Sequence, residues 1–212
     1  MKKFALLTAF VLMCCTMTGC LEDKSAPKIP FEVAPTLEPY TAPAGTFDVD
    51  AVRSNIYLKG QHFDLPLKVY DLGKGWEYKL FDRKEYGLKN GNGLATIYYN
   101  GVEMGTVSLE NCYEGKEKAS VIYSIAIKSN DCSIYNITPM VSTIGDVEFL
   151  LGPPESVDKV ERPYTNVYHY GINLGLDEKG IFRGHTIVIS FDESGVVDYI
   201  NITYSDLTSQ GQ

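Results

Sequence analysis

Histidine and cysteine side chains are the residues of this chain best suited to catalysis or metal binding, and their spacing favours neither. His62, His169 and His185 are at least 16 residues apart. A zinc site needs three or four ligands, commonly in close pairs such as H-x-x-x-H. The sequence also contains no G-x-S-x-G or H-E-x-x-H motif. We therefore expect no metal site, no cofactor and no enzymatic activity, and we interpret the histidines as strand residues.

Cys20 closes the segment with the most specific chemical signal. Lys2 and Lys3 precede the apolar run 4–13, and small residues follow up to Thr18-Gly19-Cys20. This pattern is typical of an export signal, and the run is too short to span a bilayer comfortably. It resembles the lipobox of bacterial lipoproteins. The resemblance implies a signal peptide at residues 1–19, cleavage before Cys20, and lipidation of Cys20 by diacylglycerol and by acyl chains such as palmitate.

Two other interpretations of the N-terminus are a plain secretory peptide and an uncleaved membrane helix. The first would need an A-x-A-like cleavage site, and none precedes residue 25. The second would need about 18 consecutive apolar residues. The lipoprotein interpretation places the chain at the cell membrane, lipid-anchored on its extracytoplasmic face.

Residues 20–45 form a lipidated cysteine followed by a proline-rich tether, with five of the ten prolines of the chain. Such a composition favours extended polyproline-II structure of about 3.1 Å per residue, so the tether could span roughly 75 Å. Without residues 1–19 the chain has 17 Lys and Arg against 27 Asp and Glu, a net charge of about −10. This acidity argues against nucleic acid as a partner and leaves lipid on Cys20 as the membrane contact.

Cys112 and Cys132 are the cysteines that remain after Cys20, and their pairing is open. Exported chains can form disulfides. A predicted strand at 120–128 would separate the two by roughly 25 Å, at about 3.3 Å per residue, which favours two partly buried thiols.

The pattern of the remaining residues predicts an α+β protein with two units, at 46–135 and 136–212. Asn100-Gly101 between β-rich runs at 94–99 and 102–109 is a strong hairpin signal. A short helix at 67–72 and a longer one at 142–151 would each end at a glycine. Further strands are expected from alternating apolar residues. These strands are at 54–58, 62–65, 119–128, 166–172, 185–191 and 196–204.

Residue matches between the halves suggest that the two units form a tandem repeat. At a spacing of 75, Ile125 matches Ile200 and Ile127 matches Ile202. Each unit would then be a short helix packed on an antiparallel sheet.

The second half carries a family resemblance in Leu151-Gly152-Pro153-Pro154, Tyr168-His169-Tyr170 and the strand 187–191 with its following turn. It resembles the SmpA/OmlA-type (BamE-like) lipoprotein domain, which is similar in fold to the repeats of β-lactamase-inhibitor proteins. The first half, with Leu65-Pro66-Leu67 and Gly75-Trp76, is similar to segments of uncharacterised Firmicutes lipoproteins. The resemblance implies a fold used for protein contacts.

Aromatic side chains are the expected binding surface, because Tyr and Trp supply much of the energy at protein interfaces. The candidates are Trp76, Tyr98, Tyr99, Tyr164, Tyr168 and Tyr170. The alternative is that most of them pack inside the fold. We expect a non-catalytic protein-binding or scaffolding module that contacts another envelope protein, and a small-ligand-binding lipoprotein is the alternative function.

Overall fold

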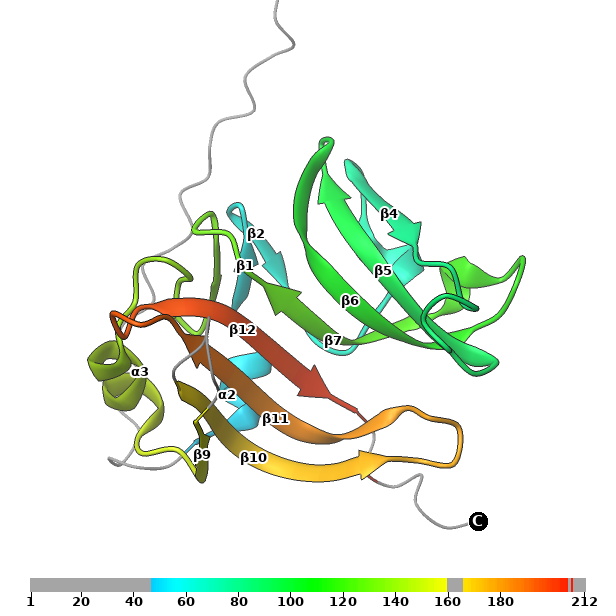
Figure 1. Ribbon diagram of the computed structural model, residues 1–212. Coiled ribbons are helices and arrows are strands. Elements are labelled where there is room, and N and C mark those ends of the chain that lie inside the picture. The colour runs from blue at the N-terminus through cyan, green and yellow to red at the C-terminus, as the bar shows by residue number, and fades with distance from the viewer. Residues whose placement is uncertain (1–46, 160–165, 206, 208–212) are drawn as a thin grey trace, which may run out of the picture. The chain divides into compact units, whose positions relative to one another are not determined.

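The computed structural model describes residues 47–159, 166–205 and 207, and these form a predominantly antiparallel β fold (Figure 1). The predicted signal peptide, Cys20, the tether and Tyr164 lie outside the described residues. The large sheet runs in the order β4 (Trp76–Leu80), β5 (Gly91–Tyr99), β6 (Val102–Cys112), β7 (Val121–Ile127), β12 (Val197–Tyr204), β11 (Phe182–Phe191), β10 (Asn166–Leu176) and β9 (Ser156–Asp158), with β3 (Leu67–Lys68) also paired to β7. A small sheet contains β2 (Gln61–Phe63), β1 (Ile56–Leu58) and β8 (Cys132–Ile134).

The expectation of an α+β protein with two helix-on-sheet units is wrong. The described residues contain two short α-helices, α2 (Val49–Arg53) and α3 (Ile144–Leu151), and one large sheet crosses both predicted units. The strands β7 and β12 pair directly, with Ile127 opposite Ile200 and Ile125 opposite Ile202. This pairing satisfies backbone groups that would otherwise form two open edges, so the strands of both halves become one sheet.

Local signals in the sequence are confirmed for the Asn100-Gly101 turn and for the glycine that ends the helix predicted at 142–151. Asn100 and Gly101 have φ of 49° and 77°, as the tight turn between β5 and β6 requires. Thr143 caps α3 in a capping box with Asp146, and Gly152 follows the helix at φ 77°. The segment 67–72 is not an α-helix, because it forms β3 and the 3₁₀ helix η1 (Val69–Leu72). A second 3₁₀ helix, η2 (Glu117–Ala119), precedes β7.

One face of the large sheet carries the hydrophobic core. Alternate residues of its central strands are fully buried, among them Val107, Ile125, Ile187 and Ile200. Residues of the small sheet and of both α-helices belong to the same cluster, including Ile56, Leu58, Val52, Val147 and Leu151. Because side chains alternate across a strand, the other residues of these strands point to the opposite face. No helix among the described residues is both long and apolar enough to cross a membrane.

The helix α2 is held to the C-terminal strand of the sheet. The Arg53 guanidinium lies 4.5 Å from the centre of the Tyr204 ring, and the Tyr204 hydroxyl donates to Asp50 at 3.2 Å. The His185 ring stacks on Tyr204 with centroids 4.1 Å apart. Arg53 also bonds Asp50 at 2.8 Å, and it donates to the Leu65 carbonyl at 2.7 Å. The start of the described chain is therefore fastened to β11 and β12.

Candidate functional site

The sheet face opposite the core is lined mainly by small uncharged side chains. The register places Thr96 beside Thr106, Thr106 beside Ala126, and Ser108 beside Ser124. The same row continues through the ladders of β7, β12 and β11. We call this surface the polar face. Its residues are Thr96, Thr106, Ser108, Ser124, Ala126, Thr186, Val188, Ser190, Tyr199, Asn201 and Thr203.

Hydrogen bonds between side chains order the middle of the polar face. The Thr203 hydroxyl donates to the Ser124 hydroxyl at 2.9 Å, and the side-chain oxygen Oδ1 of Asn201 lies 3.2 Å from each of these hydroxyls. The Asn201 amide donates to the Tyr199 hydroxyl at 3.2 Å. Ser124 and Thr203 are 4% and 5% exposed, whereas Tyr199 and Asn201 are half-buried. Packed, hydrogen-bonded hydroxyls present donors and acceptors in fixed positions, which favours recognition over acid–base chemistry.

One end of the polar face opens into a groove of about 380 Å³. Thr106, Ala126 and Tyr199 line it, and Lys128 and Met140 stand at its rim. The Lys128 ammonium lies 5.6 Å from the centre of the Tyr199 ring. Gly105 keeps this part of the sheet close-packed, because a Cβ there would lie 2.4 Å from the Ala126 carbonyl oxygen. The volume falls in the range of about 300–1,000 Å³ that is usual for ligand sites.

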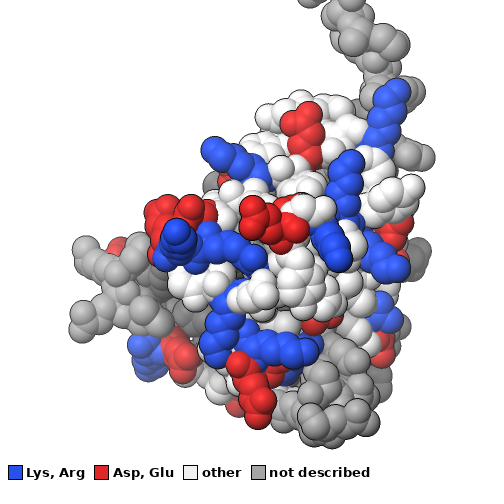
Figure 2. Space-filling model, turned by 90° about the vertical axis from the view of Figure 1, so that its right-hand side faces the viewer, with Lys and Arg blue, Asp and Glu red and all other residues white. Residues whose placement is uncertain are grey.

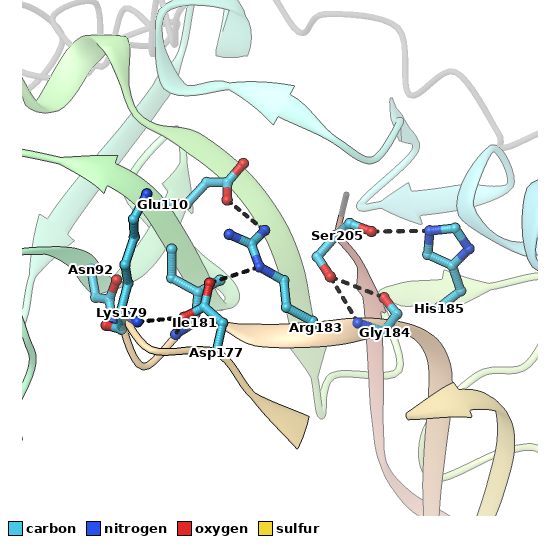
Figure 3. A network of polar contacts seen from close by, with 9 residues as sticks. All are labelled: Asn92, Glu110, Asp177, Lys179, Ile181, Arg183, Gly184, His185 and Ser205. Atoms are coloured by element: carbon cyan, nitrogen blue, oxygen red, sulfur yellow. Dashed lines mark hydrogen bonds and ion pairs between the residues drawn. The ribbon is translucent and has the colours of Figure 1, made fainter. Parts of the chain in front are cut away.

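The hairpin between β10 and β11 is bonded to β5 and β6 at the other end of the polar face (Figure 3). Arg183 bonds Glu110 of β6 at 3.0 Å, and the Asn92 amide of β5 donates to the Lys179 carbonyl at 2.8 Å. Asn92 and Glu110 are register partners on the same side as Thr96 and Thr106. The hairpin tip therefore lies over this end of the polar face.

The described aromatic residues among those singled out from the sequence, which exclude Tyr164, do not gather on one surface. Trp76 packs between Phe63 and Tyr99, with ring centroids at 6.0 and 5.1 Å. Tyr98 directly precedes Tyr99 on β5 and is half-buried. Tyr168 and Tyr170 are 9% and 1% exposed, and their hydroxyls donate to Glu148 and to the Gly152 carbonyl. Burial raises the pKa of both tyrosines. These two side chains serve the core beneath α3.

The histidines and cysteines each have separate structural surroundings. His62 bonds the Ser54 carbonyl at 2.8 Å, His169 bonds Asp158 at 3.0 Å, and His185 bonds the Ser205 carbonyl at 3.0 Å. Cys112 and Cys132 are both free and buried. Within residues 47–159, 166–205 and 207, no group of three His, Cys, Asp or Glu side chains could hold a metal ion.

A second, smaller pocket of about 120 Å³ lies beside Arg83, Cys112 and Glu117. The Arg83 guanidinium donates to the carbonyl oxygens of Asn92 and Cys112, which ties the loop before β5 to the end of β6. This pocket is therefore built around a structural arginine.

Charged side chains are mixed in sign on the face shown in Figure 2. Lys and Arg lie among Asp and Glu there and do not form a patch of one sign. The eleven residues of the polar face are uncharged, and charged side chains border them: Lys128 and Glu103 at the groove, Glu110 at the opposite end, and Lys79 beside Thr96. Sequence reasoning missed this surface. Its signal was the alternation of Ser, Ala, Asn and Thr with isoleucine in 124–127 and 200–203.

Comparison with known proteins gives one weak structural similarity. No protein-family model matches the chain, and no curated protein matches it significantly. Among solved structures, the chain is similar to a DUF4309 family protein (YjgB) from Bacillus subtilis subsp. subtilis strain 168, with 14% sequence identity and a TM-score of 0.26. The match covers 48% of this chain and 58% of that one. A similarity this weak carries no argument about fold or function.

Proposed function

We propose that this chain is an extracytoplasmic, membrane-anchored lipoprotein whose folded domain binds another envelope protein through the polar face, without catalysis. The observation that carries the proposal is the polar face itself. It crosses at least five strands, it is uncharged and hydrogen-bonded, and the helices α2 and α3 pack on the other side of the sheet.

The chemistry of the polar face supports a protein partner. Protein interfaces are poor in charged residues at their centre and carry their charges at the rim. Here Lys128 and Glu103 lie at one end of the polar face and Glu110 lies at the other, and between them is a centre of hydroxyl, amide and methyl groups. The side chains in the middle are already held in place, so a partner would lose little side-chain entropy by ordering them.

The anchor in this proposal depends on the sequence. The residues 1–20 have the pattern of a lipoprotein signal, and the proline-rich segment after them gives the domain reach. Two or more acyl chains are needed for stable anchoring, which the modification of Cys20 would supply.

The variant Ala126→Arg tests the proposal directly, because its side chain would fill the groove at the open end of the polar face. We expect the wild-type chain to be cross-linked to an envelope protein in its native host and the variant to lose that product. The matched control is Val157→Arg, an exposed change on the edge strand β9. Circular dichroism would show that both variants fold. If Ala126→Arg keeps the cross-linked product, the polar face is not the binding surface.

A small ligand in the groove is the second candidate, favoured by the groove volume of about 380 Å³. Tyr199 offers an aromatic wall, and Lys128 offers a cation beside it. A screen of small polar compounds by thermal shift would support this function if one compound stabilises the wild type and leaves Ala126→Arg unchanged. Protein cross-linking that persists in the presence of that compound would separate the two functions.

A further inference from the structure

The hairpin between β10 and β11, which we call the arm (residues 173–184), is bound to the sheet mainly by polar contacts. Lys89 donates to the Glu178 carbonyl at 2.9 Å, and Asn92 donates to the Lys179 carbonyl at 2.8 Å. Tyr123 contacts the Phe182 backbone and the Ser108 side chain. Of the arm's large apolar side chains, Ile181 is buried, whereas Leu174 and Leu176 are 42% and 70% exposed.

Arg183 is the centre of this attachment (Figure 3). Its side chain is 5% exposed and lies 3.0 Å from both Asp177 and Glu110. Asp177 belongs to the arm itself and also accepts from the backbone N–H groups of Lys179 and Ile181. Glu110 belongs to β6. The pair with Asp177 therefore holds the arm in shape, and the pair with Glu110 holds it against the sheet.

Asn92 is the second point of attachment on the sheet. The residue is 7% exposed, and its side-chain amide donates to the Lys179 carbonyl at 2.8 Å. The contact between the arm and the ends of β5 and β6 thus consists of one buried ion pair and a few hydrogen bonds.

We propose that the arm is a latch over the polar face and that its release controls how much of that face a partner can reach. When the arm is closed, a partner can reach the polar face only at the groove beside Thr106 and Ala126. When the arm is open, the surface that a partner can reach extends along β5 and β6 to Asn92 and Glu110. The regulatory role depends on the proposed binding function, whereas the opening itself is a property of the domain alone.

The variant Glu110→Gln tests the opening, because it removes the charge that holds the arm to β6 and leaves the Asp177 pair within the arm. Hydrogen exchange on the mature chain should become faster by roughly tenfold or more in residues 173–182. Exchange in residues 187–191, the C-terminal half of β11, should change much less. The control is Asp192→Asn, which alters the turn between β11 and β12 and should leave the arm unchanged. Equal acceleration in the arm and in the C-terminal half of β11 would mean that no separate latch exists.

Thiol labelling tests whether the arm covers the polar face. Ser108 contacts Tyr123, which in turn contacts the Phe182 backbone of the arm, so Ser108→Cys should react slowly with a maleimide while the arm is closed. Adding Glu110→Gln should increase the labelling rate at this position by about the same factor as exchange in the arm, measured by peptide mass mapping. If hydrogen exchange shows that the arm opens while the labelling rate stays constant, the arm does not cover the polar face. Neither readout uses a partner, so these results are separate from any failure of partner binding.

Discussion

Ile125 of β7 lies directly opposite Ile202 of β12, and both side chains are fully buried. These strands are far apart in the sequence, and each is the last strand of its own antiparallel group in the large sheet. The pair therefore sits where the two halves of the sheet meet. Unfolding either half would expose the edge and the apolar face of the other.

Truncation at this junction should destabilise the whole domain. We expect Ile125→Ala to lower the free energy of unfolding by about 2–5 kcal/mol, because it removes buried methyl groups and leaves a cavity. Urea denaturation followed by circular dichroism would measure the change. The control Val102→Ala, at a side chain that is 43% exposed, should change it by less than about 0.5 kcal/mol. Two separate transitions in the wild-type chain would contradict a jointly folded sheet.

The sequence predicted the elements of this junction but not their partner. The matches Ile125–Ile200 and Ile127–Ile202, at a spacing of 75, suggested a repeat. In the structure the same four residues cross over, and Ile125 faces Ile202 while Ile127 faces Ile200. Both strands bury a face of alternating isoleucines. The same residue pattern therefore arises whether the two strands belong to separate repeats or pair with each other in one sheet. Pairing across about 75 residues has no local signal.

Close packing at Gly105 should make this position intolerant of a side chain. A Cβ there would lie 2.4 Å from the Ala126 carbonyl oxygen, so Gly105→Ala must displace β7 or break a ladder bond. We expect it to lower the melting temperature measurably. Gly145→Ala in α3 is the opposite case, since its Cβ would have only ordinary contact at 3.7 Å from Thr143. That change should stabilise the domain by about 0.5–1 kcal/mol through helix propensity.

The Cys132 thiol should make stability fall at high pH. Burial raises its pKa from 9.0 to about 11. The pKa of this thiol is higher in the folded state than in the unfolded state. Its contribution to the free energy of unfolding is therefore fully present below pH 9 and is lost as the pH rises towards 11. The loss corresponds to about 2–3 kcal/mol over two pH units. Comparing the wild type with Cys132→Ala by denaturation at pH 8 and pH 10.5 isolates this effect from ionising tyrosines. Parallel pH profiles would contradict it.

The cap of α3 should be sensitive to acid. The Thr143 backbone N–H and hydroxyl bond Asp146 and lower the pKa of its carboxyl below 3.8. A lowered pKa gives a contribution that is present above pH 4 and lost as the pH falls through the folded-state value. Asp146→Asn should cost about 0.5–1 kcal/mol at pH 7 and very little near pH 2. Asp71→Asn, an exposed change in η1, is the matched control.

Membrane attachment should depend on one sulfur atom. If the chain is anchored as proposed, Cys20→Ser should move it from the membrane fraction to the soluble fraction of its host. Labelling with a radioactive or alkyne-bearing palmitate should mark the wild type and not the variant. A variant that stays in the membrane fraction would show that another contact holds the chain there.

The polar face was harder to predict than the core for a physical reason. Isoleucines at every second position report burial, whereas the serines and threonines between them are equally compatible with an ordinary solvated face. Only the register brings Ser108, Ser124 and Thr203 into one row. The tyrosines gave the opposite error. Tyrosine is common at protein interfaces, which suggested a binding surface, but Tyr168 and Tyr170 are buried in the core.

The fastening of α2 to Tyr204 determines how the domain would carry a mechanical load. Force applied through residue 47 would reach α2 first, and from there Arg53 and Asp50 would pass it to β12. That strand lies in the interior of the sheet, with β7 and β11 on either side. Pulling α2 away from β12 would have to break these contacts, while β12 itself would stay paired on both sides.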